Sequence, residues 1–170
     1  MNRVKVFFLV ILLMALSACG FRMAGKAELD PVFDNTYVAY QSGGREVAVQ
    51  LKKQFRTNEF NLVSKEDADV IVTILYELRD REILAVDGQG KVREYELIMS
   101  VGVDAKSAEG KTYLANQNVR LTRSLLFNID DVLGNQREQE AIYQEMREDI
   151  ARLIIYRLQA VTPVDNAEAS

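Results

Sequence analysis

Few residues in this chain have side chains that can do covalent or metal chemistry. Its 170 residues contain no histidine and a single cysteine, Cys19. Without histidine there is no imidazole to activate a nucleophile or to ligate a metal ion, and one cysteine excludes an internal disulfide and any multi-cysteine metal site. Glu77, Glu94 and Glu96 look like paired carboxylates, but glutamates at alternate strand positions beside arginines indicate cross-strand ion pairs. The sequence therefore predicts no catalytic residue, no metal site, no cofactor and no enzyme.

The surroundings of Cys19 indicate a covalently attached lipid. Residues 1–5 carry two basic side chains and no acid, and residues 6–16 form an unbroken apolar run of 11 residues. That run is too short for a spanning helix, which needs about 20 residues, but it suits a secretory signal. Leu16, two small residues and Cys19 then resemble the bacterial lipobox, in which the cysteine sulfur is alkylated by diacylglycerol. The alternatives are an ordinary signal peptide with a chance cysteine, or a poor membrane anchor.

An acylated Cys19 is expected to begin the mature chain and to hold it on a membrane. Each buried methylene contributes about 0.8 kcal/mol, and more than one acyl chain makes anchoring stable. The residue after Cys19 is Gly20 and not aspartate. By resemblance to bacterial lipoprotein sorting, this predicts that the lipoprotein is anchored on the periplasmic side of the outer membrane. Loss of residues 1–18 removes Arg3 and Lys5 and lowers the formal charge from −4 to −6. A chain this acidic is not expected to bind nucleic acid by bulk attraction.

The remainder of the chain has the length of one domain, and its periodicity predicts the element order β-α-β-β-β-α. Three long alternating segments are joined by short glycine turns, which indicates an antiparallel meander. A short extended piece is expected at residues 60–63, and Gly134 is expected to interrupt the first turn of the last helix. The predicted strands are residues 36–40, 69–86, 93–105 and 113–127, and the predicted helices are residues 45–58 and a segment from Asp130 or Asp131 to about residue 160.

The apolar side chains of each long strand share one parity, so both helices are expected to cover the same sheet face. This predicts a two-layer α+β sandwich with a mostly antiparallel four-stranded sheet. In the last helix the apolar stripe is Ile142, Met146, Ile150, Leu153, Ile154 and Leu158. The expected divisions of the chain are a signal peptide at residues 1–18, a lipidated N-terminus and tether at 19–34, a single domain at 35–160 and a disordered tail at 161–170.

The other face of the sheet is expected to be polar. Alternation along residues 69–86 places Val70, Val72, Ile74, Tyr76 and Leu78 on the apolar face, and Glu77, Arg79 and Arg81 on the polar one. The third long strand adds Asn118, Arg120, Thr122 and Ser124 to that polar face. Two interpretations stay open: a face exposed to solvent, common in antiparallel sheets, or a surface that contacts something polar and charged.

Four short segments together resemble the LptE family of lipopolysaccharide-assembly lipoproteins. Residues 19–22 read CGFR, similar to the family's C-G-[FW]-x start, and residues 94–101 read EYELIMSV, similar to its E-Y-x-x-I-M-x-V strand. Residues 123–124, followed by apolar side chains, resemble its R-S-F-F element, and residues 138–140 resemble its N-E-Q-D opening of the final helix. Their order and spacing over residues 19–160 carry the resemblance more than any single segment does.

The resemblance implies a non-enzymatic outer-membrane lipoprotein that sits as a plug inside a large β-barrel partner, LptD, and assists its assembly. The pair is implied to insert lipopolysaccharide into the outer leaflet, with this chain binding lipopolysaccharide directly. A polar sheet face suits a polar barrel lumen, and arginine or lysine suits phosphate. Two basic positions of the family fall at Asp87 and Asn135 here. The candidates for lipopolysaccharide binding are Arg79, Arg81, Lys91, Arg93, Arg120, Arg123 and Arg137.

Two other classes of protein fit a small tethered α+β lipoprotein. One is a scaffold or activator of a peptidoglycan synthase, and the other is a lipoprotein of a phospholipid-transport complex. Co-purification separates these two classes from the LptE family, because the partner is an outer-membrane β-barrel for the LptE family, a synthase for the scaffold and an inner-membrane transporter for the phospholipid-transport lipoprotein.

Overall fold

The computed structural model describes residues 29–41 and 43–161. Cys19, the expected signal peptide and residues 162–170 of the expected tail lie outside the described residues. The elements follow the predicted order, preceded by one short 3-10 turn. They are η1 (Pro31–Phe33), β1 (Thr36–Tyr40), α2 (Arg45–Thr57), β2 (Val70–Val86), β3 (Val92–Ser107), β4 (Thr112–Leu126) and α3 (Val132–Gln159).

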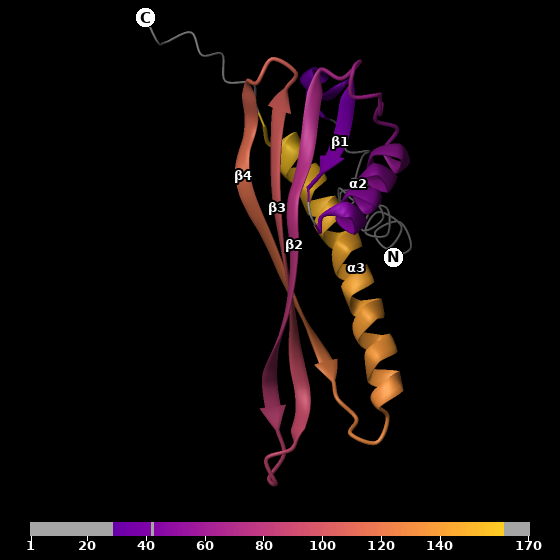
Figure 1. Ribbon diagram of the computed structural model, residues 1–170, viewed down its shortest axis with the longest axis vertical. Coiled ribbons are helices and arrows are strands. Elements are labelled where there is room, and N and C mark those ends of the chain that lie inside the picture. The colour runs from indigo at the N-terminus through magenta and orange to yellow at the C-terminus, as the bar shows by residue number, and fades with distance from the viewer. Residues whose placement is uncertain (1–28, 42, 162–170) are drawn as a thin grey trace, which may run out of the picture.

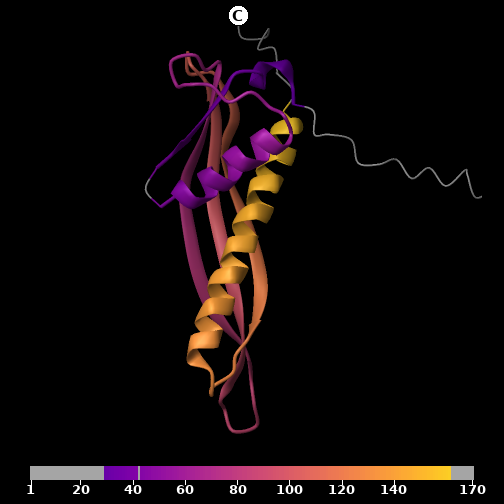
Figure 2. The same cartoon turned by 90° about the vertical axis from the view of Figure 1, so that its right-hand side faces the viewer.

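The four strands form one sheet in the order β1-β2-β3-β4, with β1 parallel to β2 and the other neighbours antiparallel. Both helices cover the same face of this sheet (Figure 2), which confirms the predicted two-layer α+β sandwich. β1 pairs only with residues 70–74 of β2. The molecule is therefore long and narrow: β1 and α2 lie at one end, here called the β1 end, and the β2–β3 turn lies at the other, here called the hairpin end (Figure 1).

The apolar core is built mainly at the β1 end. α2 contributes Val47, Leu51 and Phe55, which follow the predicted helical spacing and are buried. The stripe of α3 is confirmed at its centre, while Ile142 is partly buried and Leu153 is 36% exposed. The largest fully buried side chains that α3 contributes to the core are Met146, Ile150, Ile154 and Leu158.

The folded part of the chain begins earlier than the expected boundary at residue 35. Phe33, at the end of η1, is only 1% exposed and belongs to the apolar core. Its ring lies 6.0 Å from that of Tyr113, and its carbonyl accepts a hydrogen bond from the Thr36 hydroxyl. The end of the expected tether is therefore packed, because an aromatic side chain there completes the core. The expected extended piece at residues 60–63 forms a bridge between Leu62 and Thr36.

A β-bulge at Leu75 reverses the side-chain parity of β2. Ile74 pairs with Val103 but Tyr76 pairs with Gly102, so β2 has one more residue than β3 at this point. The prediction that Tyr76 and Leu78 face the helices is wrong. Tyr76 lies over Gly102 on the open face, where a β-carbon on that glycine would come within 2.4 Å of its ring, and Leu78 is 61% exposed.

The same bulge corrects the predicted position of three charged residues. Beyond Leu75, Glu77, Arg79 and Arg81 pair with Val101, Met99 and Leu97, whose side chains are buried under the helices. The three charged side chains therefore face α3. The prediction that Arg79 and Arg81 share the open face with Arg120 is wrong, since simple alternation along the strand does not survive an inserted residue.

α3 begins without the expected interruption at Gly134. Asp131 is the N-cap, and its Oδ1 accepts a hydrogen bond from the Gly134 N–H at 2.8 Å. A β-carbon at Gly134 would come within 2.1 Å of the Asp131 carboxylate. The glycine therefore makes room for the cap. Among the described helices, none combines the length and the apolar character that crossing a membrane requires.

Candidate functional site

Exposed apolar side chains gather at the hairpin end. The sheet brings its strand ends together there, because Ile83 and Leu125 pair with Tyr95 from either side, and the Phe127 N–H donates to the Arg93 carbonyl at 2.8 Å. Twelve large apolar residues are exposed in the described chain, and seven of them lie in this region. These seven, called the hairpin-end surface below, are Ile83, Leu84, Val86, Leu126, Ile129, Val132 and Leu133.

The turn between β4 and α3 presents part of this surface. Asn135 is buried, and its side chain accepts from the Asn128 N–H at 3.0 Å and donates to the Asn128 carbonyl at 2.6 Å. This pair of hydrogen bonds fixes the turn, so that Val132 and Leu133 point to solvent in the first turn of α3. Asn135 therefore has a structural contact at the position where the family resemblance places a basic residue. Arg137, two residues further on, is exposed.

Asp87 closes the hairpin turn. Its Oδ1 accepts from the N–H groups of Gln89 and Lys91, both at 2.9 Å, and its Oδ2 accepts from the Arg93 guanidinium at 2.9 to 3.0 Å. These contacts hold the pKa of Asp87 below its usual value; the hydrogen bond from Lys91 is the largest cause, followed by those from Gln89 and Arg93. Asp87 thus shapes the turn and neutralises Arg93, while Lys91 is held through its backbone, whose N–H donates to the Asp87 carboxylate and whose carbonyl accepts from the Asp87 N–H at 2.8 Å.

Arg79 and Arg81 lie between β2 and α3. The Arg79 Nη1 is 3.3 Å from a Glu140 carboxylate oxygen, and the Arg81 Nη1 donates to the Gln139 amide oxygen at 3.1 Å. The Arg81 guanidinium also lies 4.3 Å from the centre of the Tyr95 ring. Both side chains are therefore engaged with protein groups at the hairpin end.

A buried ion pair beside them was missed by sequence reasoning. Arg147 of α3 and Glu77 of β2 are 3.0 Å apart, and each side chain is 5% exposed. Arg147 also contacts Glu140 and Gln144. The available signal was the position of Arg147 directly after Met146, beside the apolar stripe of the last helix. A charged side chain at such a position needs a buried partner.

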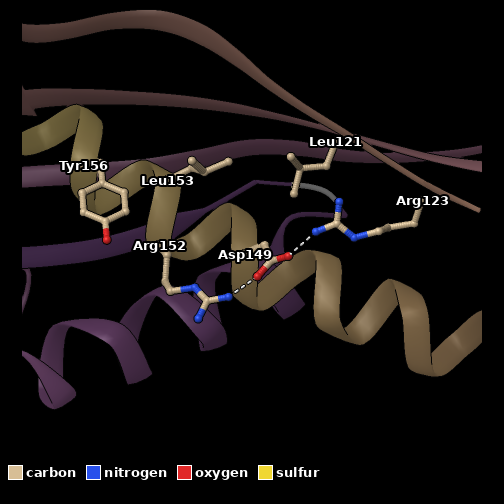
Figure 3. A pocket seen from close by; sticks show the side chains of 6 residues that line it. All are labelled: Leu121, Arg123, Asp149, Arg152, Leu153 and Tyr156. Carbon is tan, nitrogen blue, oxygen red and sulfur yellow. Dashed lines mark hydrogen bonds and ion pairs between the residues drawn. The ribbon is translucent and has the colours of Figure 1, made fainter.

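Arg123 lies beside a groove between α3 and β4. Its Nη2 is 2.7 Å from Asp149, which also pairs with Arg152. Leu121 and Leu153 approach one another across this groove, with Tyr156 further along α3 (Figure 3). The groove has a cavity of about 350 Å³ and is called the α3–β4 groove below; its lining residues are Leu121, Arg123, Asp149, Arg152, Leu153 and Tyr156.

The structure does not bring the seven candidate cations together. Within residues 29–41 and 43–161, it gives no side-chain hydrogen bond or ion pair for Lys91, Arg120 or Arg137. Lys91 lies in the turn between β2 and β3, a few residues beyond Val86, and Arg137 follows the exposed Val132 and Leu133 in α3, so both are near residues of the hairpin-end surface along the chain. Arg120 lies apart from them, opposite Ser100 on the open sheet face. Clusters of three or more metal-ligating side chains are absent from the described part of the chain.

This fold recurs in solved structures of small bacterial lipoproteins. The solution structure of an uncharacterized lipoprotein B from Nitrosomonas europaea is 28% identical, with a TM-score of 0.68 over 83% of this chain and 91% of that one. The crystal structure of the rare lipoprotein B from Shewanella oneidensis is 20% identical, with a TM-score of 0.64 over 74% of this chain and 94% of that one. The domain therefore has the architecture of this class of lipoproteins.

Sequence comparison gives the family within that class. The model of the LptE family, described as lipopolysaccharide-assembly, matches residues 31–158. The LPS-assembly lipoprotein LptE of Photorhabdus laumondii is 23% identical over 169 residues, which cover 99% of this chain and 92% of that protein. The chain belongs to the LptE lipopolysaccharide-assembly family, and the resemblance found in its sequence is confirmed.

Proposed function

We propose that this chain is an outer-membrane lipoprotein that binds lipopolysaccharide at its hairpin end and serves as plug and assembly factor of an LptD-type β-barrel. Family membership supports the assembly role over a synthase scaffold or a phospholipid-transport lipoprotein. One observation carries the binding part of the proposal. The hairpin-end surface joins seven exposed apolar side chains to Lys91 and Arg137, whose charged groups have no partner in the described residues.

The hairpin-end surface matches the chemistry of lipopolysaccharide, which combines acyl chains with phosphates. Burying one exposed leucine or isoleucine contributes about 1.5–3 kcal/mol, so a few contacts with acyl chains supply much of the affinity. The two cations then fix the position of phosphates. Because the chain is acidic overall, with a formal charge of −4, attraction to phosphate must come from such local groups.

The plug role is supported by the open sheet face and by the shape of the molecule. Ser100, Asn118, Thr122 and Ser124 lie on the open face, together with Arg120. Such a face is compatible with the polar lumen of a barrel. The long, narrow outline (Figure 1) is compatible with insertion into a barrel. None of these features calls for enzymatic chemistry.

The anchor belongs to the proposal because Cys19 lies outside the described residues. We expect acyl chains on Cys19, and we expect Cys19→Ala to give a soluble or signal-retaining protein. Mass spectrometry of the N-terminal peptide tests this directly: an unmodified Cys19 in the wild-type protein would contradict it.

The binding proposal is tested by removing apolar side chains from the hairpin-end surface. Leu126 and Leu133 are 70% and 67% exposed, so changing both to serine costs the fold little. We expect binding of lipopolysaccharide by the full-length lipoprotein in detergent to weaken at least tenfold. The matched control changes Val49 and Leu78, which are 50% and 61% exposed elsewhere, to serine. An equal loss in both double variants would contradict a site at the hairpin end.

A further inference from the structure

β4 presents a sheet edge that is regular over its second half. It is the last strand of the sheet, and within residues 29–41 and 43–161 no strand pairs with its outer side. From Gln117 to Leu126 its pairing with β3 contains no register shift. β2, the opposite edge at the hairpin end, has shifts at three places. Bulges protect an edge against pairing with another strand, and a regular edge lacks that protection.

The hydrogen bonds of β4 show which backbone groups point outward. The N–H of Phe127, just after the strand, bonds to β3, so odd-numbered residues turn toward β3 and even-numbered residues turn away from it. In agreement, the carbonyls of Asn118 and Thr122 accept hydrogen bonds from the guanidinium groups of Arg157 and Arg123. The N–H groups of alternate residues from Arg120 onward therefore point outward along this edge.

An apolar groove runs beside this edge. In the α3–β4 groove, Leu153 and Tyr156 are 36% and 63% exposed and lie on the helix side of Leu121 (Figure 3). A second cavity of about 370 Å³ adjoins β4 nearer its start, where Tyr113 and Arg157 contribute to the lining. A strand added to β4 would direct every second side chain into these cavities, since alternate residues of a strand share a face.

The charge along this edge indicates the occupant. β4 contains Arg120 and Arg123 and no acidic residue, and α3 adds Arg152 and Arg157. Asp149, the acidic residue of the α3–β4 groove, is already paired with two arginines. A second copy of this chain, added through its own β4, would bring arginines opposite arginines, which is unfavourable. A segment that carries carboxylates is the complementary partner.

We propose that the β4 edge and the α3–β4 groove form a docking site for an extended, acidic segment of a partner polypeptide, which adds to β4 as a further strand. Its backbone groups pair with those of even-numbered β4 residues, and its apolar side chains contact Leu121, Leu153 and Tyr156. Its carboxylates pair with Arg123 and Arg157, whose guanidinium groups then release the backbone carbonyls of Thr122 and Asn118. The site shares only Leu126, at the end of β4, with the hairpin-end surface, and it does not depend on the proposed function.

The probe that tests this site is a synthetic peptide of about ten residues in which valine and glutamate alternate. A peptide of the same length in which valine and lysine alternate is the matched probe. We expect the full-length lipoprotein in detergent to bind the glutamate peptide at least about tenfold more tightly, by fluorescence anisotropy. Binding should slow amide hydrogen exchange at Arg120, Thr122 and Ser124. Equal binding of the two peptides, or no protection of these amides, would overturn the proposal.

A variant pair isolates the backbone contact. Thr122→Pro removes an outward N–H and no bond to β3, so the domain should fold, as proline is tolerated at edges. Thr122→Ala keeps the N–H and is the control. We expect binding of the glutamate peptide to weaken about tenfold in the proline variant and to stay unchanged in the alanine variant. Unchanged binding in both would overturn the proposal. The proposal would also be overturned if the chain without peptide formed a dimer that Thr122→Pro dissociates and Thr122→Ala does not, because the β4 edge would then bind a second copy.

Discussion

The two ends of the contact between α3 and the sheet differ in chemistry. Near the β1 end, α3 buries Ile154 and Leu158 in an apolar core that it shares with α2. Toward the hairpin end the same helix meets β2 through the ion pair of Arg147 with Glu77 and through the contacts of Arg79 and Arg81. The β1 end therefore buries most of its large apolar side chains, with exceptions that include Tyr40 and Val49, whereas the hairpin end leaves seven of them exposed.

This difference separates stability from recognition. Apolar burial contributes about 25 cal/mol per Å², while a buried ion pair is weak evidence for net stability and an exposed pair contributes about 0–1 kcal/mol. The β1 end is therefore expected to hold the fold together. The hairpin end is held in place by polar contacts that specify position, and its exposed apolar side chains stay available for a ligand.

The largest expected effect comes from charging the apolar core. Ile150 is 0% exposed, so Ile150→Asp buries a carboxylate without a partner and should cost about 4 kcal/mol of unfolding free energy or more. Leu153→Asp, on the same helix but at a residue that is 36% exposed, should cost less than about 1 kcal/mol. Urea unfolding measures both. Similar losses in the two variants would show that this face of α3 is not the buried one.

Breaking the buried ion pair is the next largest effect. Arg147→Met leaves the buried Glu77 carboxylate with only Arg79, 3.6 Å away and 44% exposed, as a partner, and should cost about 3 kcal/mol. Changing Glu77 to Met as well removes this poorly paired buried charge, so the double variant should be more stable than Arg147→Met alone. Thermal unfolding of the three proteins tests this. A double variant less stable than Arg147→Met would contradict this, because it would mean that the Glu77 carboxylate stabilises the hairpin end without Arg147.

Reversing the free cations should affect the ligand and spare the fold. Lys91→Glu with Arg137→Glu should weaken lipopolysaccharide binding at least tenfold, since charge-assisted bonds contribute about 1.5–3 kcal/mol each. Arg45→Glu with Lys65→Glu changes the net charge equally at two exposed residues outside the hairpin end. A direct binding assay compares them at moderate salt. Equal weakening in both pairs would show that overall charge governs binding.

The smallest expected effect is the acid titration of the hairpin turn. The pKa of Asp87 lies below its ordinary value of 3.8, so its stabilising contribution is present above that value and is lost as the pH falls through the folded pKa. The amide NMR signals of Gln89 and Lys91 should therefore titrate with a midpoint below 3.8. Asp87→Asn should abolish this titration. A midpoint at or above the ordinary value would contradict the hydrogen-bonded turn.

Periodicity was sufficient to predict the element order and the common face of the two helices. Val47, Leu51 and Phe55 recur at helical spacing and are all buried, because an amphipathic helix has only one face to cover. The short glycine turns likewise predicted the meander, since such turns join neighbouring antiparallel strands. The LptE resemblance came from four short segments, three of which lie within residues 31–158, the range that the family model matches.

The positions of the charged side chains could be predicted only in part. Parity along β2 holds as far as Ile74 and fails beyond Leu75, because alternation does not show where an extra residue enters a strand. This single residue turns Arg79 and Arg81 from the open face toward α3. The partners of Arg93 and Arg123 depend on turn geometry and on a helix distant in sequence. The structure was therefore needed to identify which arginine and lysine side chains have no partner among the described residues.

The most direct test of the account is to ask where lipopolysaccharide touches this protein in growing cells. A photoreactive amino acid is placed at Leu133 in the hairpin-end surface, and in a separate strain at Val49 on α2, which is 50% exposed. After irradiation, the account predicts a covalent adduct with lipopolysaccharide at residue 133 and none at residue 49. An adduct at residue 49 with none at residue 133 would contradict the assignment of the lipopolysaccharide site to the hairpin end.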